Sequence, residues 1–487
     1  MENFCTYIAQ RAQSRNDDIF FKADAPAETA RSWATFYREV RATADFLVAR
    51  HIRPNDKIVC LLAQPLAWLQ LFFAALKIGA VPVLVNFRDK FHVQSILAEN
   101  CPFYVCVDEE LQAQGIAVPS AKTILFQATD LSGMSNKFLD INDQDEPARR
   151  SDDDLFCVLY TSGSVGKPKY VEKTYRNILT ELHFLRTLLN IQERDVVLTL
   201  VPNVHIYGLL FGLLLPTMTG SQIIFTDKLL PREVMQISAK SRVNFLIGAP
   251  IHYQVFLETD LPDRKMRQLK FAVSSGGPLP DGVAQEFFRL SDATIVELYG
   301  STETGGIAYR FWDSPKNVPA LQLFPYIETN IADPTETTEL IIRSPAISPN
   351  ILLSSGDGWY HTGDFIQFAE NTLEKFRVVG RQEQIMKIGG KRIATTQLEE
   401  ELKTIRGVRA AAVIRVDDAT LHRESGIAFV ELSEQVHLSR GDIQKEFQKI
   451  SAHFRAIRDI VIVDKIPRNQ SGKIIYSDLK SLVPKKP

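Results

Sequence analysis

The sequence predicts an α/β protein with a large N-terminal domain of layered, mostly parallel sheets and a small α+β C-terminal domain. Up to about residue 378, short apolar runs alternate with amphipathic stretches, a pattern that favours parallel sheets covered by helices. After Arg381 the chain changes to a shorter mixture of helices and strands. The chain has 487 residues, of which 45% are hydrophobic, enough for one large core and one small core. We therefore expect domains at residues 1–380 and 381–487.

The strands of the large domain are expected at short runs rich in Val, Ile, Leu and Phe. These runs are KIVCLL at 57–62, VPVLVN at 81–86, YVCV at 104–107, TILFQ at 123–127, QIIFT at 222–226 and FLIGAP at 245–250. The amphipathic spacing of apolar residues predicts helices at Arg176–Leu189 and Asp281–Leu290.

The small domain is expected to contain two helices and three strands. The helices are expected at Thr396–Ile405 and Arg440–Phe454, and the strands at 410–416, 426–432 and 460–464. The change in pattern begins close to Glu383. This residue is therefore the expected position of a hinge between the two domains.

Composition excludes several classes of function. A net charge of −2 without a stripe of Lys and Arg gives no electrostatic signal for nucleic-acid binding. The five cysteines lack CxxC or Cys/His metal spacing, which predicts reduced, mostly buried thiols. The N-terminus has no basic start and apolar core, and the longest apolar stretches are short or interrupted. We expect a cytoplasmic protein without a transmembrane segment, either a monomer or a homodimer.

The stretch YTSGSVGKPK, Tyr160 to Lys169, follows the apolar run LFCVL and predicts a flexible loop that holds phosphates. It offers hydroxyls, small side chains and open backbone amides, followed by positive charge. The phosphate-binding residues we expect are Thr161, Ser162, Gly163, Ser164, Gly166 and Lys169. The P-loop of ATPases is excluded, because two residues rather than four separate the glycines and Pro168 follows Lys167. Composition alone would also fit an ordinary Gly/Ser surface loop.

Further segments follow in a fixed order along the chain. They are VPNVHIYGLLFG at 201–212, SSGGPLP at 274–280, ELYGSTETGG at 297–306, GWYHTGD at 358–364, GRQEQIMKIGGKRI at 380–393 and IPRNQSGKIIYSDL at 466–479. With the phosphate loop, they resemble the motifs of the adenylate-forming superfamily, which contains acyl and aryl CoA ligases, peptide synthetase adenylation domains and firefly luciferase. The resemblance covers nearly the whole chain. It implies use of ATP and Mg²⁺ and a small domain that is mobile.

The resemblance assigns nucleotide contacts to three segments. It places Gly276, Gly277 and Pro278 along the adenine and Tyr299 near it, in the same segment as Gly300 and Ser301. Thr302 would contact the α-phosphate and Glu303 would hold Mg²⁺. These residue types suit the roles, because glycine lets a flat base approach the backbone and a hard divalent cation prefers carboxylate oxygen.

The resemblance also assigns a carboxylate pocket. His205 would lie at its mouth, with Ile206, Tyr207, Gly300 and Gly305 forming part of it. By itself, His205 beside apolar residues would be read as a hydrogen-bonded core histidine. Relatives that activate amino acids tend to carry an Asp near this point, and none occurs between Pro202 and Pro216. The resemblance therefore favours a fatty or aromatic acid over an α-amino acid.

The last segments carry the expected ribose, catalytic and hinge residues. Asp364 would take both ribose hydroxyls, while Arg381 and Arg392 would lie near the ribose and phosphates. Lys473 would bridge the carboxylate and the α-phosphate. Gly389 and Gly390 would leave a passage for a phosphopantetheine thiol after the small domain swings about Glu383.

The implied reaction is activation of a carboxylic acid to an acyl-AMP, followed by transfer to the thiol of CoA or an acyl carrier protein. Thr302, Glu303, Lys473 and His205 are the expected catalytic residues. The sequence departs from the family at Val165, which replaces a Thr, at Tyr170, which replaces a Gly, and at the hinge residue Glu383. A non-catalytic nucleotide-binding or partner-binding relative and luciferase-like oxidation of an adenylate remain alternatives.

Overall fold

The structure is a computed structural model of the whole chain, in which the helices and strands form two compact units. Unit 1 comprises Met1–Pro319, Phe324–Tyr326 and Ser344–Gly358, and unit 2 comprises Ala320–Leu323, Ile327–Arg343 and Trp359–Pro487. The functional boundary expected at residues 380 and 381 remains a prediction. The residues described here are 3–23, 29–88, 90–98, 103–113, 122–126, 147–162, 168–226, 228–260, 265–266, 268–331, 334–353, 356–369, 372–388, 391–418, 423–433, 436–451, 453–468 and 474–483.

The first sheet of unit 1 carries the phosphate segment at its edge. Its strands follow the order β6-β5-β3-β4-β7-β8, and all neighbours are parallel except the antiparallel pair β7 and β8. Valines and leucines from β3, β4, β5 and β7 form its core. The strands are β3 (Lys57–Leu61), β4 (Val81–Leu84), β5 (Tyr104–Val107), β6 (Thr123–Leu125), β7 (Leu155–Ser162) and β8 (Pro168–Thr174).

The second sheet of unit 1 has the order β14-β13-β12-β11-β9-β10-β1-β2. The pairs β13/β14 and β1/β2 are antiparallel and the strands between them are parallel. Its strands are β1 (Ile19–Ala23), β2 (Thr29–Ser32), β9 (Val196–Thr199), β10 (Gln222–Phe225), β11 (Phe245–Gly248), β12 (Phe271–Ser274), β13 (Ile295–Ser301) and β14 (Gly305–Trp312).

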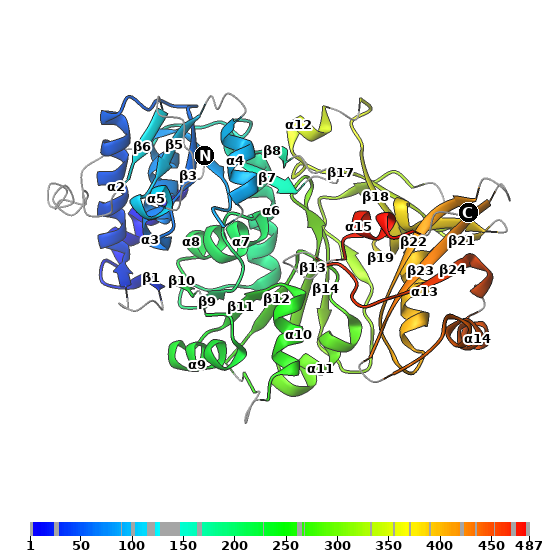
Figure 1. Cartoon of the computed structure of the whole chain (residues 1–487). Helices are drawn as coiled ribbons and strands as arrows, with labels where there is room; N and C mark the ends of the chain where they lie inside the picture. The colour runs from blue at the N-terminus through cyan, green and yellow to red at the C-terminus, as the bar shows by residue number, and fades with distance from the viewer. Residues whose placement is uncertain are drawn as a thin grey trace. The chain divides into compact units, whose positions relative to one another are not determined.

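The helices of unit 1 pack on these sheets, as Figure 1 shows for α2 and α3 beside β3 and β5. They are α1 (Phe4–Ser14), α2 (Trp33–Ala49), α3 (Pro65–Ile78), α4 (Lys90–Ala98), α5 (Glu109–Ala113), α6 (Tyr175–Leu189), α7 (Ile206–Leu209), η4 (Leu210–Leu214), α8 (Leu215–Thr219), α9 (Pro231–Ser241), α10 (Pro250–Glu258), α11 (Asp281–Ser291) and α12 (Pro349–Leu352). Among the helices of the described residues, none has the length and apolar character needed to cross a bilayer.

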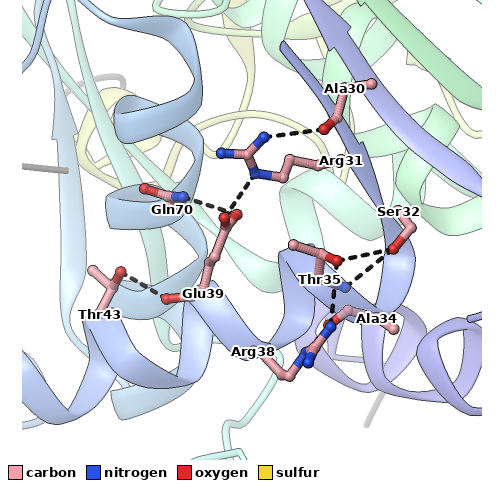
Figure 2. A network of polar contacts seen from close by, with 9 residues as sticks. All are labelled: Ala30, Arg31, Ser32, Ala34, Thr35, Arg38, Glu39, Thr43 and Gln70. Atoms are coloured by element: carbon pink, nitrogen blue, oxygen red, sulfur yellow. Dashed lines mark hydrogen bonds and ion pairs between the residues drawn. The ribbon is translucent and has the colours of Figure 1, made fainter. Parts of the chain in front are cut away.

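A polar network anchors α2 against β2 and α3 (Figure 2). The Ser32 hydroxyl caps α2 by accepting a hydrogen bond from the Thr35 amide. One turn further along, the Glu39 carboxylate accepts hydrogen bonds from Arg31 Nε at 2.7 Å and from the Gln70 amide at 3.0 Å. These contacts hold three elements together at a position where apolar packing alone would leave Gln70 unsatisfied.

The described strands of unit 2 pair in three groups. Their orders are β16-β17-β18-β19-β15, β20-β21 and β22-β23-β24. The strands are β15 (Leu321–Leu323), β16 (Glu328–Thr329), β17 (Thr338–Arg343), β18 (Tyr360–Phe368), β19 (Lys375–Arg381), β20 (Ile385–Ile388), β21 (Lys391–Ala394), β22 (Val408–Asp418), β23 (Arg423–Leu432) and β24 (Ile457–Val463). The helical segments are η5 (Gln382–Gln384), α13 (Thr395–Lys403), α14 (Arg440–Ile450), η6 (Phe454–Ala456) and α15 (Tyr476–Ser481).

The strands β22 and β23 are buried on both faces. Ala411 and Val413 enter one core, together with α13 and α14, while Ala412 and Ile414 enter a second core that contains Leu479 of α15. Successive side chains of a strand point to opposite faces. This explains why residues 410–414 are continuously apolar instead of alternating.

Most expected elements are found with shifted ends. The helix expected at Arg440–Phe454 ends at Ile450, because Ser451 adopts an extended backbone, and a short 3-10 turn follows at Phe454–Ala456. The strand expected at 245–250 ends at Gly248, since Pro250 begins α10. Cys5, Cys60, Cys106 and Cys157 are buried free thiols, as expected for these residues, whereas Cys101 lies outside the described residues.

Candidate active site

The two described ends of the phosphate segment lie in the antiparallel strands β7 and β8, which we call the phosphate hairpin. Thr161 lies opposite Lys169 in the antiparallel pair, and Ser162 lies opposite Pro168. The expected phosphate-binding residues Gly163, Ser164 and Gly166 lie outside the described residues, as does the side chain of Ser162. The register therefore positions Thr161 and Lys169 side by side, as the two described ends of the segment.

Lys169 joins this hairpin to the segment that contains Glu303. Its Nζ lies 3.3 Å from Oε1 of Glu303, and the Lys169 side chain is 45% exposed while that of Glu303 is 16% exposed. Lys169 belongs to β8 of the first sheet, whereas Glu303 lies in the turn between β13 and β14 of the second sheet. The structure thus brings the expected phosphate contact and the expected metal ligand together.

Thr302 and Glu303 lie in the turn between β13 and β14. The Ser301 amide donates a hydrogen bond to Oγ1 of Thr304 at 3.1 Å, and the Thr304 amide donates to the Ser301 hydroxyl at 3.2 Å. The strand β13 continues through Tyr299 and Gly300 to Ser301, into the segment that carries the expected nucleotide contacts. The antiparallel partner β14 extends the strand by pairing with these residues.

Gly300 permits the close approach of β13 and β14. A Cβ atom at this position would lie 2.2 Å from the carbonyl oxygen of Gly305. On the side where Gly305 would carry a Cβ, space is taken by Glu181 and Ala346. Gly305 thus allows tight packing of the chain at this point, and its expected role in the substrate pocket remains a prediction.

The expected adenine loop is held by a buried carboxylate. Oε1 of Glu297 accepts from the Leu279 amide at 3.2 Å, and Oε2 accepts from Arg310 Nε at 2.7 Å and Trp312 Nε1 at 2.8 Å. Gly276 has φ +87° and its Cβ direction is open. Gly277 is partly buried and Pro278 is exposed. An anchored loop with open glycine backbone could accommodate a flat ring.

His205, Ile206 and Tyr207 begin helix α7 at the carboxyl edge of the second sheet. His205 is the N-cap residue and is exposed, yet surrounding protein desolvates the ring enough to lower its pKa, which favours neutral imidazole. The Tyr207 hydroxyl is buried, 2.9 Å from the carbonyl oxygen of Gly248 and 2.6 Å from that of Val273. The hydroxyl thus ties α7 to the ends of β11 and β12, and the π-helix Leu210–Leu214 follows directly.

The expected ribose residue lies in unit 2. Oδ1 of Asp364 accepts from Arg381 Nε at 3.1 Å, and the two residues face each other across β18 and β19. The Asp364 side chain is 9% exposed and that of Arg381 is 68% exposed. Glu383 lies in the 3-10 turn Gln382–Gln384 and Arg392 in β21, but their side chains are not described.

The remaining predicted site residues lie outside the described residues. They are Gly389, Gly390 and Lys473, and the altered loop residue Val165 is among them as well. Their roles remain predictions.

The donor set at Glu303 fits Mg²⁺. Within the described ranges, no three His, Cys, Asp or Glu side chains gather into a group that could hold a metal. Mg²⁺ in nucleotide enzymes is bound through one or two carboxylates together with phosphate oxygens and waters. A partly exposed carboxylate beside the phosphate hairpin therefore suits a cation that arrives with its nucleotide.

Three buried polar residues near this turn were not singled out from the sequence. They are Lys173 at the end of β8 and Asn177 and Glu181 in α6. Burial lowers the pKa of Lys173 to about 8, although the Glu181 charge opposes this change. Burial likewise raises the pKa of Glu181 to about 7, opposed by Lys173. A spacing of four residues was their only signal in the sequence.

Fold and site together define an α/β enzyme of the adenylate-forming class. The model of the AMP-binding enzyme family matches residues 8–352, and that of the AMP-binding enzyme C-terminal domain matches residues 397–473. The chain belongs to the AMP-binding enzyme family, as the sequence motifs predicted.

Similar proteins cover nearly the whole chain. A medium-chain fatty-acid–CoA ligase of Escherichia coli is 25% identical over 88% of this chain and 82% of its own length. An anthranilate–CoA ligase of Pseudomonas aeruginosa is 27% identical over 89% of this chain and 88% of its own. The ATP-bound MatB structure from Rhodopseudomonas palustris is 20% identical, covers 98% of each chain and gives a TM-score of 0.82, which supports the fold.

Proposed function

We propose that this protein is an acid–thiol ligase that activates a fatty or aromatic carboxylic acid with MgATP and transfers the acyl group to a phosphopantetheine thiol. The observation that carries the proposal is the ion pair between Lys169 and Glu303. It joins the strand that follows the hydroxyl-rich and glycine-rich segment to a carboxylate suited to Mg²⁺. Both parts are needed for chemistry at a nucleotide phosphate, because such catalysis depends on positioning and on charge stabilisation.

In the first half-reaction, a carboxylate oxygen of the acid attacks the α-phosphorus of ATP. The bond to the β-phosphate oxygen breaks and pyrophosphate leaves, giving an acyl-AMP. Thr161 and Lys169 would contact phosphate oxygens, Thr302 would contact the α-phosphate, and Glu303 would hold Mg²⁺, which supplies charge neutralisation. Lys473 would add a positive charge between the carboxylate and the α-phosphate.

A neutral His205 suits a position beside the acid. Desolvation lowers its pKa, so the ring carries no charge at neutral pH. Its N–H can orient a carboxylate by hydrogen bonding without forming a strong ion pair that would reduce the nucleophilicity of the oxygen. We therefore assign His205 to orientation of the acid.

In the second half-reaction, the thiol sulfur attacks the acyl carbon, AMP leaves with the oxygen it shared with the acyl group, and the thiol proton is released. The small domain would turn about Glu383, withdrawing Lys473 and presenting Gly389 and Gly390. Domain closure of this kind excludes water from a reactive intermediate.

The substrate class and acceptor rest on the relatives. The Escherichia coli and Pseudomonas aeruginosa relatives are named as ligases for a medium-chain fatty acid and for anthranilate, both with CoA. These names support CoA as the first acceptor to test. A carrier protein is the second acceptor, because a phosphopantetheine thiol is common to both.

The experiment is pyrophosphate release with MgATP across fatty acids, benzoates, cinnamates and amino acids, without any thiol. We expect release with one class of fatty or aromatic acid, and then thioester formation on adding CoA or an acyl carrier protein. The Lys473→Ala variant should lose activity by about 10²-fold or more. Lys480→Ala, which alters an exposed lysine of α15, is the matched control.

Absence of pyrophosphate release with every acid would refute the proposed reaction. Full adenylate formation by Lys473→Ala would refute the role of that lysine alone. Light emission or oxygen uptake with an adenylate would instead identify luciferase-like oxidation.

A further inference from the structure

A row of buried polar side chains runs beneath the turn that carries Thr302 and Glu303. Lys173 is 1% exposed, Asn177 is 5% exposed and Glu181 is 6% exposed. Asn177 and Glu181 are four apart in α6 and therefore lie on one face of the helix. Lys173 lies near the end of β8, just before the helix begins. Lysine and glutamate are almost never buried to this extent without a specific partner. We call these three residues the α6 clamp.

The two charged members of the α6 clamp bind the turn at both ends. Lys173 Nζ donates to the carbonyl oxygen of Glu303 at 3.3 Å. Oε1 of Glu181 accepts from the Gly306 amide at 3.0 Å. Both contacts are to the main chain, so they fix the course of the turn without occupying the side chains of Thr302 and Glu303.

The middle of the α6 clamp binds a second segment. Asn177 Nδ2 donates to the carbonyl oxygens of Pro345 at 2.8 Å and Ile347 at 3.0 Å. Lys173 Nζ also donates to the carbonyl oxygen of Ala346 at 3.1 Å. The Ser348 amide in turn donates to the Glu303 carbonyl oxygen at 2.9 Å. The 345–348 segment thus supports the turn, and the α6 clamp holds both.

Glu181 packs directly against the backbone of Gly305 and Gly306. A Cβ at Gly305 would lie 2.6 Å from Oε2 of Glu181, and a Cβ at Gly306 would lie 2.9 Å from Oε1. Gly305 also has φ +70°, in the left-handed region. Glycine at both positions lets the carboxylate press against the backbone, which brings the Gly306 amide within hydrogen-bonding distance.

Stability alone is a poor explanation for this arrangement. Desolvation of a buried lysine and glutamate offsets much of their attraction, and apolar residues of similar volume often stabilise a protein equally well. Apolar residues cannot supply directional hydrogen bonds to specific carbonyl and amide groups. The hydrogen bonds of the α6 clamp define one position for the turn.

We infer that Lys173, Asn177 and Glu181 are positioning residues that hold the Glu303 turn in the geometry needed to bind Mg²⁺ and the nucleotide phosphate. The inference rests on the proposed function, in which Glu303 is the metal ligand and Thr302 the phosphate contact. Loss of outer residues that orient a metal ligand typically lowers metal affinity or activity by about 10-fold to 100-fold.

The test compares Glu181→Gln with Glu181→Leu. Both variants remove the charge and keep a side chain of similar size, but only Gln keeps an oxygen that can accept from the Gly306 amide. We measure the Mg²⁺ concentration that gives half of the maximal thermal stabilisation by ATP. We expect Glu181→Leu to raise it by about 10-fold or more and Glu181→Gln to stay within about 3-fold of the unmodified protein.

Lys173→Met tests the other end of the turn, and Lys270→Met is its matched control. Lys270 forms an ion pair with Asp195 at 2.7 Å, well separated along the sheet from the Glu303 turn. In pyrophosphate release, we expect Lys173→Met to raise the half-saturating Mg²⁺ concentration by about 10-fold while the KM for the acid changes by less than about 3-fold. Lys270→Met should change neither value.

Equal Mg²⁺ midpoints for Glu181→Leu, Glu181→Gln and the unmodified protein would overturn the inference. If Lys173→Met does not fold, the comparison of Glu181→Leu with Glu181→Gln still tests the inference. An unmodified protein that is stabilised by MgATP but releases no pyrophosphate with any acid would refute the proposed reaction, while the Mg²⁺ midpoints of the Glu181 variants would still test the α6 clamp.

Discussion

The Nζ of Lys57 forms a hydrogen bond with the phenol oxygen of Tyr170, linking the central strand β3 to the phosphate hairpin. The same Nζ lies 3.3 Å from Oε1 of Glu172 and 5.1 Å from the centre of the Tyr170 ring. Tyr170 stands at a position where the resemblance to the adenylate-forming superfamily leads us to expect glycine. In this chain, the extra side chain is therefore used to brace the hairpin.

Removing the phenol oxygen should loosen the phosphate hairpin. Tyr170→Phe keeps the ring, which packs edge-to-face on Tyr160 at 5.5 Å, and removes the phenol oxygen that bonds to Lys57 and interacts with Glu172. We expect a loss of about 1 kcal/mol in the free energy of unfolding, since the bond involves a charged donor at a half-buried site. We also expect a higher KM for ATP. Chemical denaturation and ATP titration of pyrophosphate release measure the two effects.

A double-mutant cycle separates this contact from its surroundings. Lys57→Met removes the other partner. The double variant should lose less free energy of unfolding than the sum of the two single losses, because both changes remove the same contact. Strict additivity of Tyr170→Phe and Lys57→Met would contradict a direct interaction between the two side chains.

Glu303→Gln tests the proposed metal ligand. The amide keeps the size of the side chain but loses the charge that attracts Mg²⁺ and pairs with Lys169. We expect pyrophosphate release to fall by about 10²-fold and the Mg²⁺ requirement to rise. Glu286→Gln, at an exposed glutamate paired with Arg289, is the matched control and should behave as the unmodified protein. Activity within about 3-fold for Glu303→Gln would exclude it as the ligand.

The sequence predicted the α/β class and most strands because these depend on local patterns of apolar residues. It predicted the family through motifs that resemble those of the adenylate-forming superfamily. It predicted Lys169 and Glu303 as site residues, and the structure brings them together. It did not predict that β13 would continue to Ser301, because that extension depends on pairing with β14. The continuation of a strand by a distant partner has no local signal.

The sequence did not predict the residues of the α6 clamp, for a related reason. Lys173, Asn177 and Glu181 bind main-chain groups more than a hundred positions away along the chain. A buried charge is recognised only when its partners are known. Tyr207 was expected to form part of the substrate pocket. In the structure its hydroxyl hydrogen-bonds to carbonyl oxygens of the sheet and so holds α7 in place.

The buried carboxylate of Glu297 should be a major contributor to the stability of unit 1. It accepts from Arg310 and Trp312 as well as from the Leu279 amide, and its side chain is 8% exposed. Glu297→Gln leaves the Arg310 charge without its buried partner, so we expect a loss of about 3 kcal/mol. Chemical denaturation measures this loss.

Glu286→Gln again provides the control for Glu297→Gln. Its ion pair with Arg289 is exposed on both sides, with side chains 42% and 58% accessible. Exposed pairs contribute about 0 to 1 kcal/mol. Equal losses for the Glu286 and Glu297 variants would show that the Glu297 network does not stabilise the loop.

Because the four described cysteines are buried, the rate at which a reagent labels their thiols should report unfolding. Burial raises the pKa of the Cys5, Cys106 and Cys157 thiols to about 12 from an ordinary value of 9.0, and raises that of Cys60 as well. The folded protein therefore keeps these protons at a pH where the unfolded chain loses them. As pH rises from about 9 to about 12, these groups lower the free energy of unfolding.

A Cys101→Ser variant leaves only these four thiols, which are free and buried in the structure. At pH 8 we expect a thiol reagent to label them no faster than the protein unfolds, because the thiolate is the reactive form and burial withholds both the thiolate and access. Adding denaturant should release all four thiols together. Rapid labelling of Cys157 alone in the folded protein would instead show local opening of β7, the strand that leads into the phosphate segment.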